Sequence, residues 1–233
     1  MAAQTIASGS SANLTACAFS KTGWTFAGWA TDSTGNVVYN DQESYTMGTD
    51  DVTLYAKWTP PTTYSLCDIG PAGGFVFYDK GSYSGAPSWR YLEAAPLSTE
   101  WTDKQWGSHG TLIGGTGTGI GTGQSNTTTI VTWLDWNKDD TYGDVTSKTD
   151  RAAYLCDGLT LGVYSDWFLP SLDELNLMYE NLKVAGVGGF TDYYYWSSSE
   201  FNFLHAYFQY FNNGNKFANY KNNTDRVRAV RAF

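Results

Sequence analysis

The chain has 233 residues, enough for one large domain or two of ordinary size with a substantial buried core. Trp, Tyr and Phe make up 17% of the residues, whereas charged residues make up only 16%. This composition excludes a coiled coil, an ordinary helical bundle and a disordered tail. The net charge of −9 argues against a nucleic-acid partner, which would require many cations for phosphate contacts.

Residues 1–58 contain short β-like runs separated by Gly, Asn and Asp turns, with no helical periodicity. We predict strands at 24–29, 37–39 and 52–58, and hence a small all-β module. The following Thr59-Pro60-Pro61-Thr62-Thr63 predicts a short, stiff linker over 59–63, because prolines disfavour helix and lack amide donors. A second domain is then expected over 64–233.

The second domain mixes strands and helices. Its best helix signal starts at Ser171, which forms a capping box with Glu174 ahead of an apolar stripe. These patterns predict an α+β domain in which helices flank an antiparallel sheet. The expected helices are 125–136, 149–159 and 171–183, and the expected strands are 74–78, 193–199, 205–211 and 226–233.

Two loops were considered as ligand sites. The glycine-rich run 114–123 lacks a Gly-x-Gly-x-x-Gly register and a following Gly-Lys-Ser/Thr, so a flexible surface loop is a better interpretation than a phosphate site. A second loop carries alternating oxygen donors, as calcium loops do, but lacks the EF-hand glycine and the final glutamate. We favour a solvated acidic loop over a metal site at these residues: Asp135, Asn137, Asp139, Asp140 and Asp144.

Residues for catalysis are sparse. Only two histidines, His109 and His205, are present for a zinc site or a Ser-His-Asp triad. Four glutamates could meet in space, but their spacing does not favour a glycosidase: Glu93, Glu100, Glu174 and Glu200. The three cysteines show no Cys-x-x-Cys and are expected to be small buried residues: Cys17, Cys67 and Cys156. We predict no catalytic residue, no metal and no cofactor.

Aromatic residues and asparagines are concentrated in residues 201–220, which we call the aromatic segment. The run Phe201-Asn202-Phe203-Leu204-His205 obeys neither strand alternation nor helical periodicity, so some of these rings should face solvent. Exposed rings among amides are typical of a protein-binding surface. A core hairpin with a turn at 212–215 explains the pattern equally well.

Two family resemblances extend this interpretation. In the first module, Thr22-Gly23-Trp24-Thr25-Phe26-Ala27-Gly28-Trp29 and the closing Leu54-Tyr55-Ala56-Lys57-Trp58 resemble the Listeria–Bacteroides (internalin B-type) repeat of bacterial surface proteins. The resemblance implies a β-grasp-like stalk unit and export. Such repeats begin with an upstream strand that the sequence does not reveal, so the module is expected to be truncated or to have a divergent first strand.

Residues 64–233 resemble the DUF1566 (Lcl C-terminal) family, whose fold is a C-type lectin variant related to formylglycine-generating enzyme. Within that family they are most similar to treponemal variable proteins that a diversity-generating retroelement diversifies. The motifs that carry the resemblance are Asp68-Ile69-Gly70-Pro71-Ala72-Gly73-Gly74-Phe75, Arg90-Tyr91-Leu92-Glu93-Ala94-Ala95-Pro96, Ile120-Gly121-Thr122-Gly123, Asp166-Trp167-Phe168-Leu169-Pro170-Ser171, Tyr195-Trp196-Ser197-Ser198-Ser199-Glu200 and Arg226-Val227-Arg228-Ala229-Val230-Arg231.

The resemblance implies that the aromatic segment is rewritten by adenine-specific mutagenesis of AAC codons, which yields NNC codons. Every residue from Phe201 to Phe208 has an NNC codon, whereas the flanking Trp196 and Glu200 have none. The variable, ligand-binding role is carried over to Phe201, Asn202, Phe203, Leu204, His205, Tyr207, Phe208, Tyr210, Phe217, Asn219 and Tyr220. Tyr207 departs from a Trp that is often found there.

We therefore expect a non-catalytic, monomeric binding protein at the cell surface, attached to a membrane only through an anchor outside this chain, with a protein ligand. The basic residues near the C-terminus would form a separate surface or pair with scaffold carboxylates: Lys216, Lys221, Arg226, Arg228 and Arg231. The alternatives are a carbohydrate-binding or formylglycine-generating-enzyme-like enzyme, and a purely structural stalk.

Overall fold

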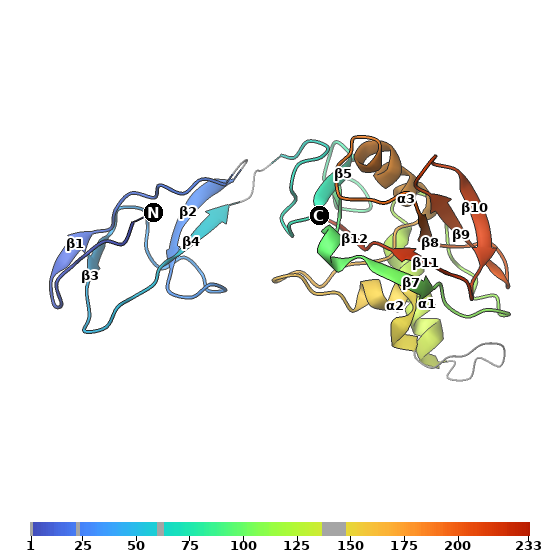
Figure 1. Ribbon diagram of the computed structural model, residues 1–233, viewed down its shortest axis with the longest axis horizontal. Helices are drawn as coiled ribbons and strands as arrows, with labels where there is room; N and C mark the ends of the chain where they lie inside the picture. Colours follow the sequence, from blue (N-terminus) through green and yellow to red (C-terminus); the bar gives the residue numbers. More distant parts are fainter. Residues whose placement is uncertain (1, 22–23, 60–62, 137–147) are drawn as a thin grey trace. The chain divides into compact units, whose positions relative to one another are not determined.

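A computed structural model describes residues 2–21, 24–59, 63–136 and 148–233. The chain divides into two units, residues 1–63 and 64–233 (Figure 1). Thr22 and Gly23 of the first motif, the middle of the expected linker and most of the acidic loop lie outside the described residues. In the described part, no helix is both long and apolar enough to cross a membrane.

The N-terminal unit is all-β, as predicted. Strand β2 (Thr25–Ala30) pairs antiparallel with β4 (Tyr55–Thr59), so two of the three expected strands are present. Of the third, only Tyr39 bridges Trp29. The upstream strand missing from the sequence prediction is β1 (Ser11–Asn13), which pairs with β3 (Ser44–Thr46). Its residues, Ser-Ala-Asn, have low strand propensity, so β1 is recognised only by its pairing with β3.

A bulge in β2 gives the N-terminal unit its buried centre. Gly28 has φ of 140°, and a Cβ atom there would lie 2.6 Å from the Tyr39 carbonyl oxygen, so only glycine fits. The bulge lies beside Trp29, which is buried against the rings of Phe19 and Phe26.

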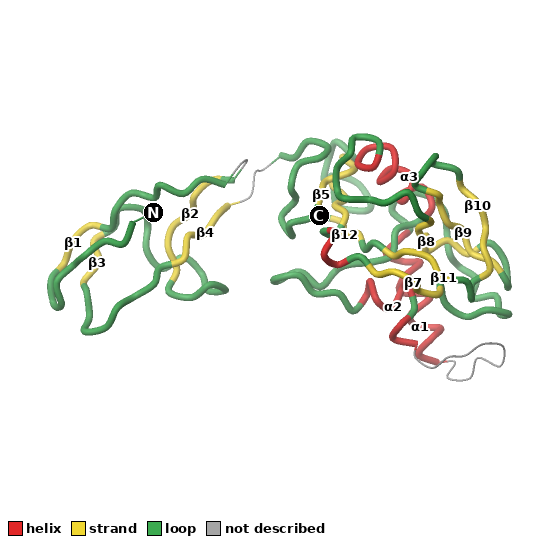
Figure 2. Tube along the Cα trace, in the orientation of Figure 1, coloured by secondary structure: helices red, strands yellow, loops and turns green. Residues whose placement is uncertain are grey.

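The C-terminal unit is α+β, with many strands and few helices (Figure 2). Its five-stranded sheet has the order β10-β9-β8-β11-β7, and a three-stranded sheet has the order β12-β6-β5. The strands of the first sheet are β7 (Trp101–Gln105), β8 (Tyr194–Glu200), β9 (His205–Tyr210), β10 (Lys216–Tyr220) and β11 (Thr224–Val227). Those of the second are β5 (Phe75–Asp79), β6 (Tyr91–Ala94) and β12 (Val230–Ala232).

All three predicted helices exist. Helix α1 is Gly123–Trp136, and the second, α2 (Ala152–Asp157), is shorter than expected. Helix α3 (Leu172–Met178) starts with the predicted capping box and continues as a π-helical turn, Tyr179–Lys183. The single strand expected at 226–233 is wrong: Arg228 and Ala229 separate β11 from β12, and these two strands belong to different sheets.

The core of this unit lies on both sides of strands β8 and β9. On one side, Trp196 and Phe208 pack with residues of α1 and α2 such as Ile130. On the other side, Tyr195 packs with residues of α3 such as Leu175. Alternation along β8 sends Trp196 and Tyr195 to opposite faces, so the helices hold the sheet from both directions (Figure 1).

Candidate functional site

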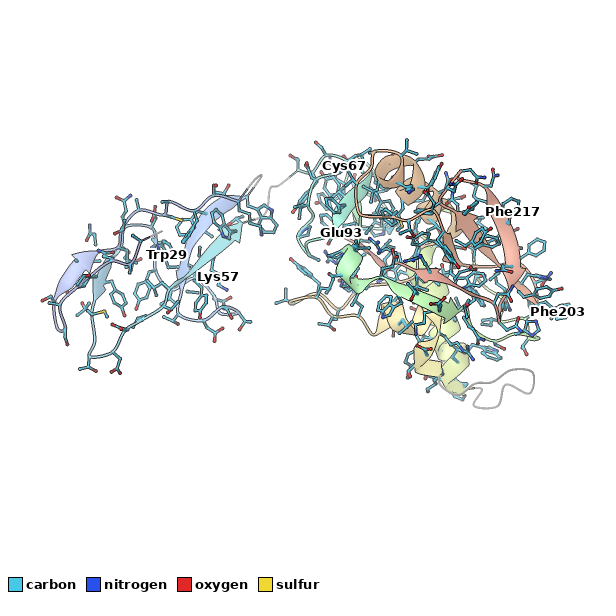
Figure 3. All side chains as sticks on the ribbon, in the orientation of Figure 1. Trp29, Lys57, Cys67, Glu93, Phe203 and Phe217 are labelled. Atoms are coloured by element: carbon cyan, nitrogen blue, oxygen red, sulfur yellow. The ribbon has the colours of Figure 1, made fainter. Side chains whose placement is uncertain are left out.

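The aromatic segment forms the β9–β10 hairpin and the turn that precedes it. The predicted hairpin is present, with Tyr210 N–H bonded to the Asn215 carbonyl across its turn. It is not wholly a core hairpin, because four of its rings remain about half exposed. These are Phe201 at 53%, Phe203 at 52%, Phe217 at 51% and Tyr220 at 49%. Phe203 and Phe217 lie at the outer margin of the unit (Figure 3).

One group of rings gathers around His205. The centroid of its imidazole lies 4.4 Å from that of Tyr220, its neighbour across the hairpin. The Phe201 ring lies 5.2 Å from Tyr207 and 6.5 Å from His205. Asn202 fixes the turn beneath them, since its Oδ1 accepts hydrogen bonds from the backbone N–H of Leu204 and His205. Asn202 therefore shapes this surface through the backbone.

A second group of rings follows the opposite face of the hairpin. Phe217 lies 5.9 Å from Phe208, and Tyr194 lies 5.2 Å from Phe208 and 4.5 Å from Tyr210. Tyr194 and its exposed neighbour Tyr193 were missed by the sequence prediction. Strand alternation gave no signal for Tyr194, because it places this residue on the same face of β8 as the buried Trp196.

Phe208 differs from the other predicted ligand-binding residues. Its side chain is only 9% exposed and packs edge-on against Trp196 in the core. The Phe208 ring therefore offers little surface to a ligand, because the protein already covers most of it. Leu204, Tyr207, Tyr210 and Asn219 are half-buried at the base of the exposed rings.

A buried ion pair joins the two ends of the aromatic segment. Glu200 directly precedes the segment and Lys221 directly follows it, and the Lys221 Nζ lies 2.5 Å from Glu200 Oε1. The Lys221 side chain is fully buried and that of Glu200 is 3% exposed. Lys221 also donates to the Thr111 carbonyl, and Glu200 accepts the backbone N–H groups of Ile113 and Gly114. The pair thus also fixes the neighbouring glycine-rich loop.

The arginines that follow the segment also pair with scaffold carboxylates, which is one of the two arrangements expected from the sequence. Arg226 and Arg228 both contact Glu100, and Arg231 contacts Glu93 and Asp166. Together with Lys221, four of the five basic residues near the C-terminus are thereby neutralised within the scaffold. The expected separate basic surface is not formed by these four, so the exposed surface of the aromatic segment is aromatic and amide in character apart from Lys216.

The four glutamates considered for catalysis each have structural partners. Three are paired with the basic residues just described. The fourth, Glu174, accepts the backbone N–H groups of Ser171 and Gly121. Burial raises the pKa of the Glu174 carboxyl, against the opposing effect of these hydrogen bonds. The glycine-rich loop thus donates its amides to the protein's own carboxylates, so it is anchored to the scaffold.

The three cysteines differ in burial. Cys156 is buried, which raises its thiol pKa, but Cys17 and Cys67 are only partly buried, contrary to expectation. Within the described ranges, no group of three or more His, Cys, Asp or Glu residues could hold a metal ion. Asp135 pairs with Lys148, while the other acidic-loop candidates lie outside the described residues: Asn137, Asp139, Asp140 and Asp144.

Comparison with known families bears on both units. Residues 125–231, which contain the whole aromatic segment and its flanking ion pair, match a known family model. The matching family model is described as the Lcl C-terminal domain. Residues 1–57 match the Listeria-Bacteroides repeat domain. Both family resemblances inferred from the sequence are confirmed. Together they support a place for the protein among bacterial surface proteins. No curated protein matches the chain.

The C-terminal unit contains a buried carboxylate, Asp225, whose ionisation should lower the free energy of unfolding. Asp225 is 3% exposed, and the hydrogen bond it accepts from Asn219 does not offset its burial, which raises its pKa above 3.8. As pH rises above 3.8, the unfolded chain loses this proton first, so the free energy of unfolding falls. We expect Asp225→Asn to be more stable than the wild type at pH 7, and the difference to vanish in acid.

Urea unfolding of both proteins at several pH values measures this difference. Asp192→Asn is the control, because it makes the same change at a carboxylate whose pKa is shifted in the opposite direction. Hydrogen bonding from Lys183 lowers the pKa of the Asp192 carboxyl, so its stabilising contribution is present at neutral pH and disappears in acid. A loss of stability in Asp225→Asn at pH 7 would contradict the proposed effect of burial.

Proposed function

We propose that this protein is a surface-displayed, non-catalytic binding protein. Its C-terminal unit has a C-type lectin fold, and its aromatic segment is diversified by a retroelement so that related copies recognise different protein ligands. The N-terminal repeat is a spacer, and the protein works as a monomer. The family matches support the broader placement among bacterial surface proteins.

One observation carries this proposal. Within the aromatic segment, four large rings are about half exposed, while Phe208 lies in the core and a buried ion pair joins the two ends of the segment. Rigid aromatic side chains provide contact area at low entropic cost, and neighbouring amides provide adaptable hydrogen bonds. A surface of this kind can change its rings without changing the fold beneath.

The non-catalytic assignment rests on how the reactive groups are used. A thiol mechanism needs an accessible thiolate, whereas burial raises the pKa of Cys156, and the Cys17 and Cys67 thiols donate to the backbone carbonyls of Phe19 and Asn181. A carboxylate mechanism needs uncommitted acids, whereas Glu93, Glu100, Glu174 and Glu200 are bonded to cations or to backbone amides. If replacing all three cysteines abolished an activity of the protein, the thiol enzyme would be the better assignment.

Sequencing the gene from many clones, beside any near-repeat template, tests diversification. We expect substitutions only at adenines of the template, clustered within codons 201–220 and concentrated at exposed positions such as 201, 203, 217 and 220. Codons 200 and 221 should stay constant, because the buried pair they encode supports the segment. Absence of a template, or substitutions spread evenly over the scaffold, would refute the diversification proposal.

A further inference from the structure

The two sheets of the C-terminal unit have four outer edges, and three of them are covered by other segments of the chain. Phe168 bridges Val230 beside β12, and Ile69 bridges Phe75 beside β5. Arg151 bridges Gln105 beside β7. Proteins commonly cover such edges because unpaired strand backbone recruits other strands. The fourth edge, the outer side of β10, has no such bridge among the described residues.

The hairpin register identifies the backbone groups on this edge. The Tyr210 N–H donates to the Asn215 carbonyl, and the Lys221 N–H donates to the Leu204 carbonyl. Hydrogen-bonded pairs alternate along an antiparallel ladder, so the backbone groups of the odd-numbered residues of β10 point toward β9. Lys216, Ala218 and Tyr220 therefore direct their N–H and C=O groups outward. Tyr220 is already satisfied, since its N–H donates to Asn219 Oδ1 and its carbonyl accepts from Asn223.

The outward N–H groups of Lys216 and Ala218 donate to no described residue, and their outward carbonyls accept from none. They are two donors and two acceptors at the spacing of a strand ladder, on the same strand as the exposed rings of Phe217 and Tyr220. We propose that the outer edge of β10 binds an extended segment of the protein ligand as an additional strand. This inference rests on the proposed function, because the edge is continuous with the aromatic surface.

The side chains of β10 define which segment fits. Phe217 lies on one face of the sheet, and Lys216, Ala218 and Tyr220 lie on the other. A side chain on an added strand would lie about 5 Å from its neighbour on β10. The favoured ligand segment therefore carries an apolar residue beside Phe217 and an acidic residue beside the exposed Lys216. Backbone pairing supplies binding that is independent of sequence, and these side chains supply selectivity.

Substitution at Ala218 tests strand addition directly. Ala218→Pro removes an outward N–H, which β9 does not use, so the hairpin should remain intact. Ala218→Ser is the matched control, because it changes the side chain and keeps the N–H. The probe is a phage-displayed library of random linear peptides, selected on the full wild-type chain. Selected peptides should bind Ala218→Ser like the wild type and Ala218→Pro about tenfold or more weakly.

Amide hydrogen exchange of the wild-type protein provides a second measurement that involves no variant. Peptide binding should slow exchange at Lys216 and Ala218, while Phe217 and Asn219 are already protected by β9. Strand addition is overturned if no peptide prefers the wild type to Ala218→Pro, or if these two amides stay unprotected in the complex. Peptides that bind Phe217→Ala and Tyr220→Ala as well as the wild type would instead refute the aromatic surface of the proposed function.

Discussion

Replacing Lys221 by methionine is expected to lower the free energy of unfolding by about 3–5 kcal/mol, because it leaves the buried Glu200 carboxylate without its counter-charge. The lysine side chain is fully buried, so water cannot replace the lost ammonium group without opening the structure. The ammonium also holds the Thr111 carbonyl and lies over the Trp106 ring. Urea unfolding of the purified chain at neutral pH measures the loss.

Two further variants separate the buried charge from other effects. Lys104→Met removes a lysine that pairs with Asp150 at the surface, and we expect a change of about 1 kcal/mol or less. Adding Glu200→Gln to Lys221→Met should recover much of the loss, because a neutral amide can still accept from the Ile113 or Gly114 N–H. If the double variant is less stable than Lys221→Met alone, the uncompensated charge is not the cause.

Phe208→Ala is expected to remove about 3–5 kcal/mol of stability, whereas Phe217→Ala should change it by less than about 1 kcal/mol. The two phenylalanines occupy directly paired positions on adjacent strands, and their ring centroids lie 5.9 Å apart. They differ in burial: the Phe208 ring fills the core beside Trp196, and the Phe217 ring is half exposed. Thermal or urea unfolding of both variants measures the contrast.

The same pair of variants connects stability to binding. Phe217→Ala should weaken binding of a selected ligand while leaving the fold intact, and Phe208→Ala should act chiefly by reducing the folded fraction. Phe208→Leu, which keeps most of the apolar volume, should restore much of the stability. Equal stability losses from Phe208→Ala and Phe217→Ala would mean that the hairpin's two rings are not divided between core and surface.

Local signals explain what the sequence could predict. The capping box at Ser171 and Glu174 and the apolar stripe that follows it are contained in one helix, and that helix is present. Strand β6 was missed because its Glu93 suggests a surface residue. In the structure Glu93 is buried against Arg231, 138 positions later. A partner so distant in sequence leaves no trace in local pattern.

The candidate site was predicted in outline. Composition located the aromatic segment, but two equally weighted interpretations remained, an exposed surface and a core hairpin. The structure contains elements of both, because Phe208 belongs to the core and Phe217 does not. The two residues are chemically identical, and they differ only in which neighbouring strands surround them. β9 lies between two strands, while β10 has one neighbour and an open side.

The ion pair between Glu200 and Lys221 makes the aromatic segment a self-contained cassette. Its two junctions with the scaffold lie side by side, joined by a charge pair that does not depend on the residues in between. Foreign residues grafted at its exposed positions, with core residues such as Phe208 kept, would therefore enter and leave the scaffold at fixed positions. Length changes at 212–215, beyond the buried Phe211, would also leave the junctions in place. The chain thus offers a framework for combinatorial binder libraries, in which diversity is confined to the exposed positions of one segment.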